Sequence, residues 1–365
     1  MNPRSWRHCY LSGAVTRWTL WVVTSAALVG VACCRETSAA GGVKLSQYPH
    51  RVFPTLKWDT LVTIGAPSAN DTMLLNPSQI VLWGSRIAAL DWANKSVRVF
   101  SRATGHLLWK YERTGQGPGE LTCISDGVIT PASRLWVVDG CANRKVLELD
   151  TAGVLLREIH PRALPPSGWD RIAFVGRRAL VTTQLADQAL IWAEPDSLTP
   201  EQVEALPWPD SLDSSYRLDF DVASAGARGP VVLAYELGPA FVVLNGDSVR
   251  VHPYIDRVHF MKKPNPLRPA SRPDSMRYAA ITASIVGDEV FFLFGGRPRR
   301  REYPAKPTLL IDVYGLTGAY RRSYLLPVDT RSMATEDGQV FWVIEMSEGL
   351  YPEIMALRPR SDFAN

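Results

Sequence analysis

The sequence has little net charge and lacks the usual catalytic signatures. Lys and Arg number 40 against 36 Asp and Glu, which leaves a formal net charge of +4. Non-specific nucleic-acid binding needs a concentrated basic surface, so a charge this small predicts no nucleic-acid partner. The chain also lacks the His-Glu-x-x-His zinc motif and the Gly-x-Ser-x-Gly nucleophile elbow. We therefore assign no catalytic residues, no metal ligands and no cofactor from motifs.

A long apolar run stands near the N-terminus. Arg4, Arg7 and Arg17 precede the sequence WTLWVVTSAALVGVACC at residues 18–34, which ends in small residues. Basic residues followed by an apolar run of this length are typical of a secretory signal peptide. We predict an export signal over residues 1–40, and a periplasmic or outer-envelope location for the body of the protein.

The end of this signal has three interpretations. Cys33 or Cys34 could carry a lipid, which would place the protein on the membrane through that anchor alone. Cleavage after Ala40 would release a soluble protein, and retention of the apolar run would leave a membrane anchor. We favour the lipoprotein, followed by a linker at residues 41–54 and a folded domain at residues 55–365.

Cysteine is scarce, and two of the five cysteines lie in the folded domain. If residues 130–134 form a hairpin turn, Cys123 and Cys141 lie opposite each other. Directly opposed residues bring their Cβ atoms to about 4.5–5.5 Å, close to what a disulfide requires. An exported protein meets an oxidising compartment, so we predict a Cys123–Cys141 disulfide. Free buried thiols, or a metal or catalytic role, are the alternatives.

No stretch after residue 55 shows a sustained helical period. Short runs of β-branched, aromatic and Leu residues alternate with turns rich in Gly, Pro, Asn and Asp, which predicts an all-β fold. Residues 86–108 align with residues 134–156 at a period of 48 residues. Four antiparallel strands in a repeat of this size are typical of one propeller blade.

Later copies of this unit are weaker. Residues 177–199, 229–254 and 288–326 keep the order strand, loop, strand, turn, strand. The last unit, residues 337–359, ends after three strands, and residues 57–65 can supply its fourth. The sequence therefore predicts a monomeric six-bladed β-propeller of four-stranded antiparallel blades, closed by strands from both termini, which removes free sheet edges.

The sequence TGQGPGEL at residues 114–121 raises the question of a phosphate-binding loop. A phosphate loop needs a helix immediately after it, whereas the residues after Glu120 are typical of a strand. We interpret Gly115, Gly117 and Gly119 as a turn between blades, with positive φ available to each glycine. The Glu120 side chain can cap backbone amides inside this joint.

The glycine joint and the repeat after it, LWVVDGCANRKVLELDTAGVLL, resemble the NHL-type repeat of six-bladed propellers. The resemblance is clear over residues 76–160, and elsewhere it depends on the rhythm of strands. The chain also resembles exported six-bladed propeller proteins of environmental bacteria, for which few activities are known. The resemblance implies a fold, and a propeller fold does not determine a function.

Two segments of the fifth blade are rich in basic residues. They are residues 257–277 and 295–307, and strand alternation places both on the rim that carries the joints between blades. Such a cluster could bind a protein partner, an anionic carbohydrate or an acidic peptide, although a solvated loop is the simpler interpretation. The candidate binding residues are Lys262, Lys263, Arg268, Arg272, Arg297, Arg299, Arg300 and Arg301.

The sequence favours a non-catalytic propeller scaffold that binds a ligand or partner through this rim. The alternative is a calcium-dependent hydrolase of the lactonase or esterase kind, because some six-bladed propellers hold calcium in the central channel. Asp91, Asn94, Asp139 and Asn143 could reach that channel's rim in such an enzyme. A repeated Asp at the end of a strand is nevertheless most often a turn-forming residue.

Overall fold

The structure is a computed structural model. The residues that it describes form 23 β-strands, and no helix occurs among them. Within the same ranges, nothing offers a helix of the length and hydrophobicity needed to cross a bilayer. The described residues are 50–65, 73–140, 144–161, 169–183, 189–205, 220–225, 229–236, 238–246, 248–256, 279–295, 308–346 and 351–361.

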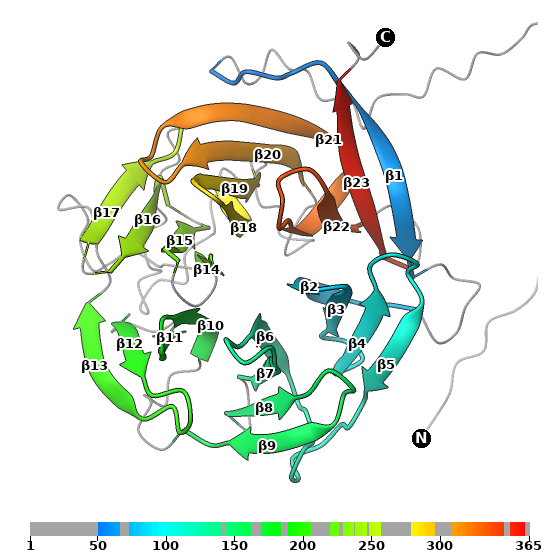
Figure 1. Cartoon of the computed structure of the whole chain (residues 1–365), viewed down its shortest axis with the longest axis vertical. Helices are drawn as coiled ribbons and strands as arrows, with labels where there is room; N and C mark the ends of the chain where they lie inside the picture. The colour runs from blue at the N-terminus through cyan, green and yellow to red at the C-terminus, as the bar shows by residue number, and fades with distance from the viewer. Residues whose placement is uncertain are drawn as a thin grey trace, which may run out of the picture. The chain divides into compact units, whose positions relative to one another are not determined.

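Four separate antiparallel sheets of four strands form blades 1 to 4. In each sheet the first strand lies nearest the centre of the ring and the last strand lies outermost (Figure 1). Blade 1 contains β2 (Pro77–Trp83), β3 (Arg86–Asp91), β4 (Ser96–Ser101) and β5 (Leu107–Tyr111), and blade 2 contains β6 (Ile124–Ile129), β7 (Leu135–Asp139), β8 (Lys145–Leu149) and β9 (Leu155–Ile159). Blade 3 contains β10 (Trp169–Val175), β11 (Arg178–Thr183), β12 (Ala189–Ala193) and β13 (Pro200–Ala205), and blade 4 contains β14 (Phe220–Ser224), β15 (Val231–Tyr235), β16 (Ala240–Asn245) and β17 (Ser248–Pro253).

Blades 5 and 6 share one long strand. The 15-residue strand β21 (Tyr320–Ala334) pairs with β20 along its first half and with β22 along its second half. It is therefore the outer strand of blade 5 and the inner strand of blade 6. The other strands are β18 (Ala280–Val286), β19 (Glu289–Phe294) and β20 (Thr308–Gly315) in blade 5, and β22 (Phe341–Glu345), β23 (Glu353–Ser361) and β1 (Leu56–Ile64) in blade 6.

The two ends of the described chain close the ring. Strand β1 pairs antiparallel with β23, from Leu56 opposite Ser361 to Ile64 opposite Ile354. This pairing completes the sixth blade with a strand from each terminus, which confirms the closure predicted from the sequence. Both of these strands would otherwise be edges available to another chain.

The hydrophobic core lies between neighbouring blades. Among the described residues, buried side chains form six clusters, one at each junction between consecutive blades around the ring. Middle strands such as β7 and β15 are buried along their whole length because they have a blade on both sides. Outer strands such as β5 alternate between more and less exposed residues, as expected for a half-solvated strand.

The N-terminal segment before β1 packs on blade 5. The Arg51 side chain is fully buried, and the Val52 carbonyl accepts a hydrogen bond of 2.9 Å from the Ser323 amide in β21. The Val52 amide also donates to the Tyr320 hydroxyl at 2.9 Å. Residues 51 and 52 fall in the range expected to be a linker. Their contacts depend on the buried charge network of Arg51, which no repeat pattern indicates.

Candidate functional site

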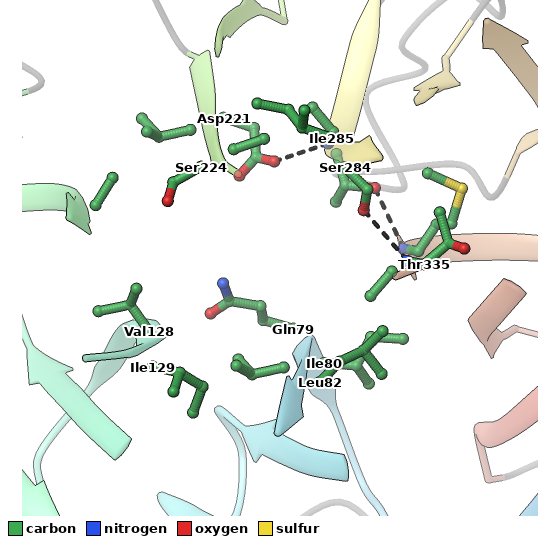
Figure 2. A pocket seen from close by; sticks show the side chains of 18 of the residues that line it. Gln79, Ile80, Leu82, Val128, Ile129, Asp221, Ser224, Ser284, Ile285 and Thr335 are labelled. Carbon is green, nitrogen blue, oxygen red and sulfur yellow. Dashed lines mark hydrogen bonds between the residues drawn. The ribbon is translucent and has the colours of Figure 1, made fainter. Parts of the chain in front are cut away.

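The central channel contains a cavity of about 540 Å³. Its wall is made by the inner strands of all six blades: β2, β6, β10, β14, β18 and β21. Figure 2 shows that polar side chains, among them Gln79, Asp221 and Ser284, line the cavity together with apolar ones such as Ile80 and Val128. The channel is thus a place where polar side chains from all six blades converge.

The polar side chains of blades 1 to 3 bond from one inner strand to the next. Gln79 accepts a hydrogen bond from the Gly127 amide at 2.8 Å and donates to Asp126 Oδ1 at 2.9 Å. Asp126 Oδ2 in turn accepts from the Ile172 amide at 2.7 Å. Inner strands have one unpaired edge, so these contacts satisfy backbone amides that no neighbouring strand can reach.

The same arrangement continues through blades 4 to 6. Asp221 Oδ2 accepts from the Ala283 amide at 2.9 Å. Thr282 Oγ1 accepts from the Met333 amide at 3.2 Å, and Ser284 Oγ accepts from the Thr335 amide at 3.3 Å. The last junction is closed by Arg331, which donates to Asn76 Oδ1. We call this set of contacts between inner strands the channel belt.

Arg171 and Arg331 are the cations of the channel belt, and Arg171 makes contacts with two neighbouring blades. Its Nη1 donates to the Ser125 carbonyl of blade 2 at 2.8 Å, and its Nε lies 3.2 Å from Asp221 Oδ1 of blade 4. One guanidinium thus joins three blades. The Arg171 guanidinium also acts on the nearby Asp126 carboxyl, so it lies close to both acids of the belt.

A β-bulge stands at the same place in five of the six inner strands. The pairing shifts between residues 77 and 79, 124 and 126, 169 and 171, 280 and 282, and 330 and 332. In four of the strands the residue after the bulge is a belt residue: Gln79, Asp126, Arg171 and Thr282. A bulge changes the direction of a side chain locally, so these bulges aim polar groups at the neighbouring blade.

Burial raises the pKa of the Asp126 carboxyl to about 6, from an ordinary value of 3.8. The nearby Arg171 guanidinium and the hydrogen bond from the Ile172 amide oppose this rise, and the Asp221 carboxylate adds to it. The environment of Asp126 is set by the junction between blades, since its partners come from blades 1, 3 and 4.

The channel hydroxyls contact backbone groups. Ser224 Oγ donates to the Phe174 carbonyl at 3.3 Å, while Thr282 and Ser284 accept from backbone amides of blade 6. These contacts join neighbouring inner strands around the cavity.

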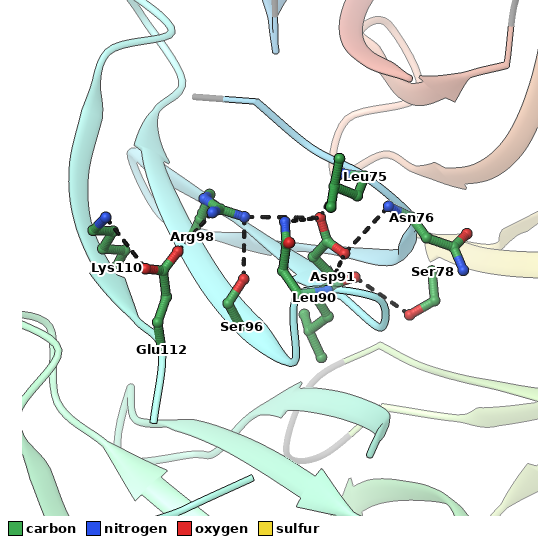
Figure 3. A network of polar contacts seen from close by, with 10 residues as sticks. Leu75, Asn76, Ser78, Leu90, Asp91, Ser96, Arg98, Lys110 and Glu112 are labelled. Atoms are coloured by element: carbon green, nitrogen blue, oxygen red, sulfur yellow. Dashed lines mark hydrogen bonds and ion pairs between the residues drawn. The ribbon is translucent and has the colours of Figure 1, made fainter. Parts of the chain in front are cut away.

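Asp91 and Asp139 occupy equivalent places at the ends of β3 and β7, and both are fully buried. Asp91 accepts from the amides of Leu75, Asn76 and Asn94 at 2.8, 3.2 and 3.0 Å (Figure 3). It therefore ties the joint before β2 to the loop after β3. The sequence interpretation of Asp91 as a turn-forming residue agrees with these contacts.

Asp139 accepts from the Thr122 amide and hydroxyl at 2.9 and 2.7 Å and from the Cys123 amide at 3.1 Å. Its role in blade 2 thus repeats that of Asp91 in blade 1. Asn143, the remaining candidate of the calcium hypothesis, lies outside the described residues. Within the described part of the chain, no group of three or more His, Cys, Asp or Glu residues is arranged to hold a metal ion.

The glycine joint at residues 114–121 is held by local contacts. Glu120 Oε2 accepts from the Gly117 amide at 2.7 Å, as predicted, and the Tyr111 hydroxyl donates to the Gly119 carbonyl at 2.5 Å. Gly115 and Gly119 have positive φ values of 150° and 69°. Gly117 does not use the positive φ that is available to it, and the Glu120 carboxylate holds its amide. The joint is structural.

The predicted binding residues lie outside the described residues. These are Lys262, Lys263, Arg268 and Arg272 in one segment and Arg297, Arg299, Arg300 and Arg301 in the other, and Cys33, Cys34 and Cys141 are likewise not described. The described ends of the two segments do meet. The Gly295 amide donates to the Ala279 carbonyl at 2.9 Å, and the Ala279 amide donates to the Glu236 carbonyl at 2.7 Å.

Three solved structures are similar to this chain in fold. A member of the DUF4221 family from Bacteroides vulgatus superimposes with a TM-score of 0.59 at 8% identity, covering 84% of this chain and 99% of its own. A candidate exported protein of Bacteroides fragilis gives a TM-score of 0.52 at 12% identity, covering 84% of this chain and 95% of its own. The structure of U3-55K gives a TM-score of 0.51 at 11% identity, covering 82% of this chain and 98% of its own. Identities this low establish the fold and nothing about activity.

Comparison of the sequence alone finds a match over only part of the chain. No curated protein matches the chain. Residues 68–165, which contain blades 1 and 2, match the model of a family described as 6-bladed beta-propeller, DUF5128. The NHL-type resemblance is not confirmed by these comparisons. The chain is therefore an all-β, six-bladed propeller whose first two blades are similar to the DUF5128 family.

Proposed function

We propose that this propeller is an exported, non-catalytic binding protein whose contact surface is the basic rim of blade 5. The observation that carries the proposal is the hydrogen bond between the Gly295 amide and the Ala279 carbonyl. Residue 279 follows the basic segment at 257–278, and residue 295 precedes the basic segment at 296–307. The described residues that border the two basic segments therefore contact each other.

The charge of the two segments defines the class of ligand. Residues 257–278 and 296–307 together contain eleven Lys and Arg residues and two acidic residues. Concentrated positive charge attracts anions over several ångströms, and Arg binds carboxylates through paired hydrogen bonds. The ligand class is a carboxylated carbohydrate or the acidic surface of a protein or peptide.

The contacts inside the channel support a role without catalysis. The belt carboxylates and hydroxyls are engaged with amides and carbonyls of neighbouring blades. Asp91 and Asp139 likewise hold the joints between strands. No observation in the described residues favours the alternative, a calcium-dependent hydrolase with a site in the channel.

Replacing Arg299, Arg300 and Arg301 with Glu tests the rim. We expect the affinity for polygalacturonate, an anionic polysaccharide used as a probe, to fall by at least about tenfold at low salt, because charge reversal turns attraction into repulsion. Binding is measured by biolayer interferometry on the immobilised polymer. The affinity of the native protein should also fall as salt is added.

The matched control carries the same change in charge on outer strands. Lys110, Arg250 and Arg360 are exposed on β5, β17 and β23, and their replacement with Glu should leave affinity within about twofold. Equal weakening by both triple variants would mean that only net charge matters. Unchanged affinity of the rim variant would remove the rim as the binding surface.

We also propose export with a lipid anchor at Cys33 or Cys34. The support is the sequence pattern of basic residues, apolar run and small residues at positions 4–40. The intact mass of protein extracted from membranes distinguishes the alternatives. A mass matching an acylated chain that begins at Cys33 or Cys34 supports the anchor, and a mass matching cleavage after Ala40 contradicts it.

We further propose the Cys123–Cys141 disulfide. Support comes from the hairpin around residues 130–134, in which Ile129 pairs with Leu135 and Ile124 pairs with Asp139. Cys123 therefore stands directly before the first paired residue of β6. Residues 41–365 purified from an oxidising compartment should show no reactive thiol after denaturation, and two after reduction. Two reactive thiols per chain before reduction would exclude the disulfide.

A further inference from the structure

A cationic surface lies at the end of the channel that carries the turns between first and second strands. Strand direction alternates within a blade, so the turns between first and second strands lie opposite the joints between blades. In blades 1 to 3 these turns place an arginine at or next to the start of the second strand. We call Arg86, Arg134, Arg177 and Arg178 the arginine arc, and we propose that it binds an acidic peptide segment.

The repeat places three arc residues in equivalent positions. Arg86 pairs with Trp83 across a two-residue turn, and Arg178 pairs with Val175 across another. Arg134 directly precedes Leu135, the first residue of β7, at the matching point of blade 2. Each arginine therefore stands at the end of its blade beside the channel mouth, and the arc crosses three consecutive blades.

Aromatic rings hold two of these guanidinium groups. Arg178 lies 4.5 Å from the centre of the Trp192 ring, and Arg86 lies 5.9 Å from that of Trp83. Stacking of this kind stabilises a cation and restricts its rotamers, while the N–H groups at the edge of the guanidinium plane remain available. The arc is thus partly ordered before any ligand arrives.

The opposite side of this mouth is acidic but neutralised. Glu289 occupies in blade 5 the position that Arg86 and Arg178 occupy in blades 1 and 3. It forms ion pairs with Arg321 and Arg322 at 2.8 and 2.7 Å. Glu336 of blade 6 is similarly paired with Arg102 at 2.6 Å. These acids therefore contribute little net charge to the mouth.

The arc has no such compensation within the described residues. None of its four arginines takes part in an ion pair with another described residue. The pKa of the exposed Asp150 carboxyl is lowered, mainly by the hydrogen bond from the Val154 amide and in smaller part by the Arg134 charge. Arg177 is exposed and the other three are half-buried. Carboxylates match the guanidinium fork, and an arc across three blades fits several carboxylates along an extended chain better than one small anion. Charge complementarity therefore selects an acidic peptide.

The test measures an oligo-glutamate peptide by fluorescence anisotropy at low salt. The background protein carries Glu at Arg299, Arg300 and Arg301, so that the blade 5 rim does not contribute. In this background we expect Arg134→Gln with Arg177→Gln to weaken binding at least about tenfold, because two charge-assisted hydrogen bonds are lost. These two arginines are chosen because neither is stacked on a Trp ring.

The matched control removes two charges from outer strands by Lys110→Gln with Arg250→Gln, and affinity should change less than about twofold. Equal affinity of the arc variant and its background, or equal weakening by the control, would overturn the proposal. A background protein that has already lost oligo-glutamate binding would also overturn it, while leaving the rim proposal intact. Unchanged melting temperatures exclude unfolding as the cause.

Discussion

Replacing Arg51 with Ala is expected to lower the free energy of unfolding by about 3–5 kcal/mol. The buried Arg51 guanidinium donates to both oxygens of Asp312 at 2.8 and 2.6 Å and to Asp256 at 2.7 Å. It also lies 4.2 Å from the centre of the Phe294 ring. Removing the cation leaves the Asp312 carboxylate buried and uncompensated, which costs far more than the loss of a surface pair. Chemical denaturation at pH 7 measures the change.

A second variant separates charge from packing. Asp312→Asn in the Arg51→Ala protein removes the uncompensated carboxylate while keeping an acceptor for the Ser323 hydroxyl, which donates to Asp312 at 2.5 Å. We expect this double variant to recover part of the lost stability. If Arg51→Ala costs less than about 1 kcal/mol, as an exposed pair would, the buried network does not anchor the N-terminal segment.

The second large effect concerns the pH dependence of stability. Burial raises the pKa of Asp126 to about 6 in the folded protein, above the ordinary value of 3.8. The folded state therefore binds more protons than the unfolded state between these values, and stability falls as the pH rises through 6. The difference of about two pKa units corresponds to roughly 3 kcal/mol, fully present below pH 4 and lost above pH 7.

Asp126→Asn isolates this contribution because Asn does not titrate. We expect the free energy of unfolding of the native protein, relative to that of the Asn variant, to fall by roughly 3 kcal/mol between pH 4 and pH 7.5. Any constant cost of the substitution, such as a weaker contact with the Ile172 amide, cancels in this comparison. Parallel pH profiles of the two proteins would show that the Asp126 carboxyl is not perturbed by burial.

The sequence predicts most of the fold because the repeat is local. The 48-residue alignment, the turn signals and the unfinished last unit define the blades and their closure before any tertiary contact is known. It does not predict that the single strand β21 belongs to two blades, because no sequence signal marks a strand shared in this way. Arg51 is also missed, because its partners Asp256 and Asp312 are more than 200 residues away.

The channel belt is predictable only in part. A polar residue such as Gln79, Asp126 or Arg171 inside an apolar strand is a signal that can be read from the sequence. The bulge that directs it and the amide that it meets on the next blade are tertiary features. For this reason the sequence predicts the loops of each rim and their charged residues, whereas the channel belt and the arginine arc are recognised only in the structure.

The most direct test of the proposed function is hydrogen–deuterium exchange of the exported protein with and without polygalacturonate. The account predicts that the polymer slows exchange in residues 257–278 and 296–307, and that the channel strands β6, β10 and β14 exchange as before. Protection confined to those channel strands, or no protection in the two basic segments at saturating polymer, would contradict it.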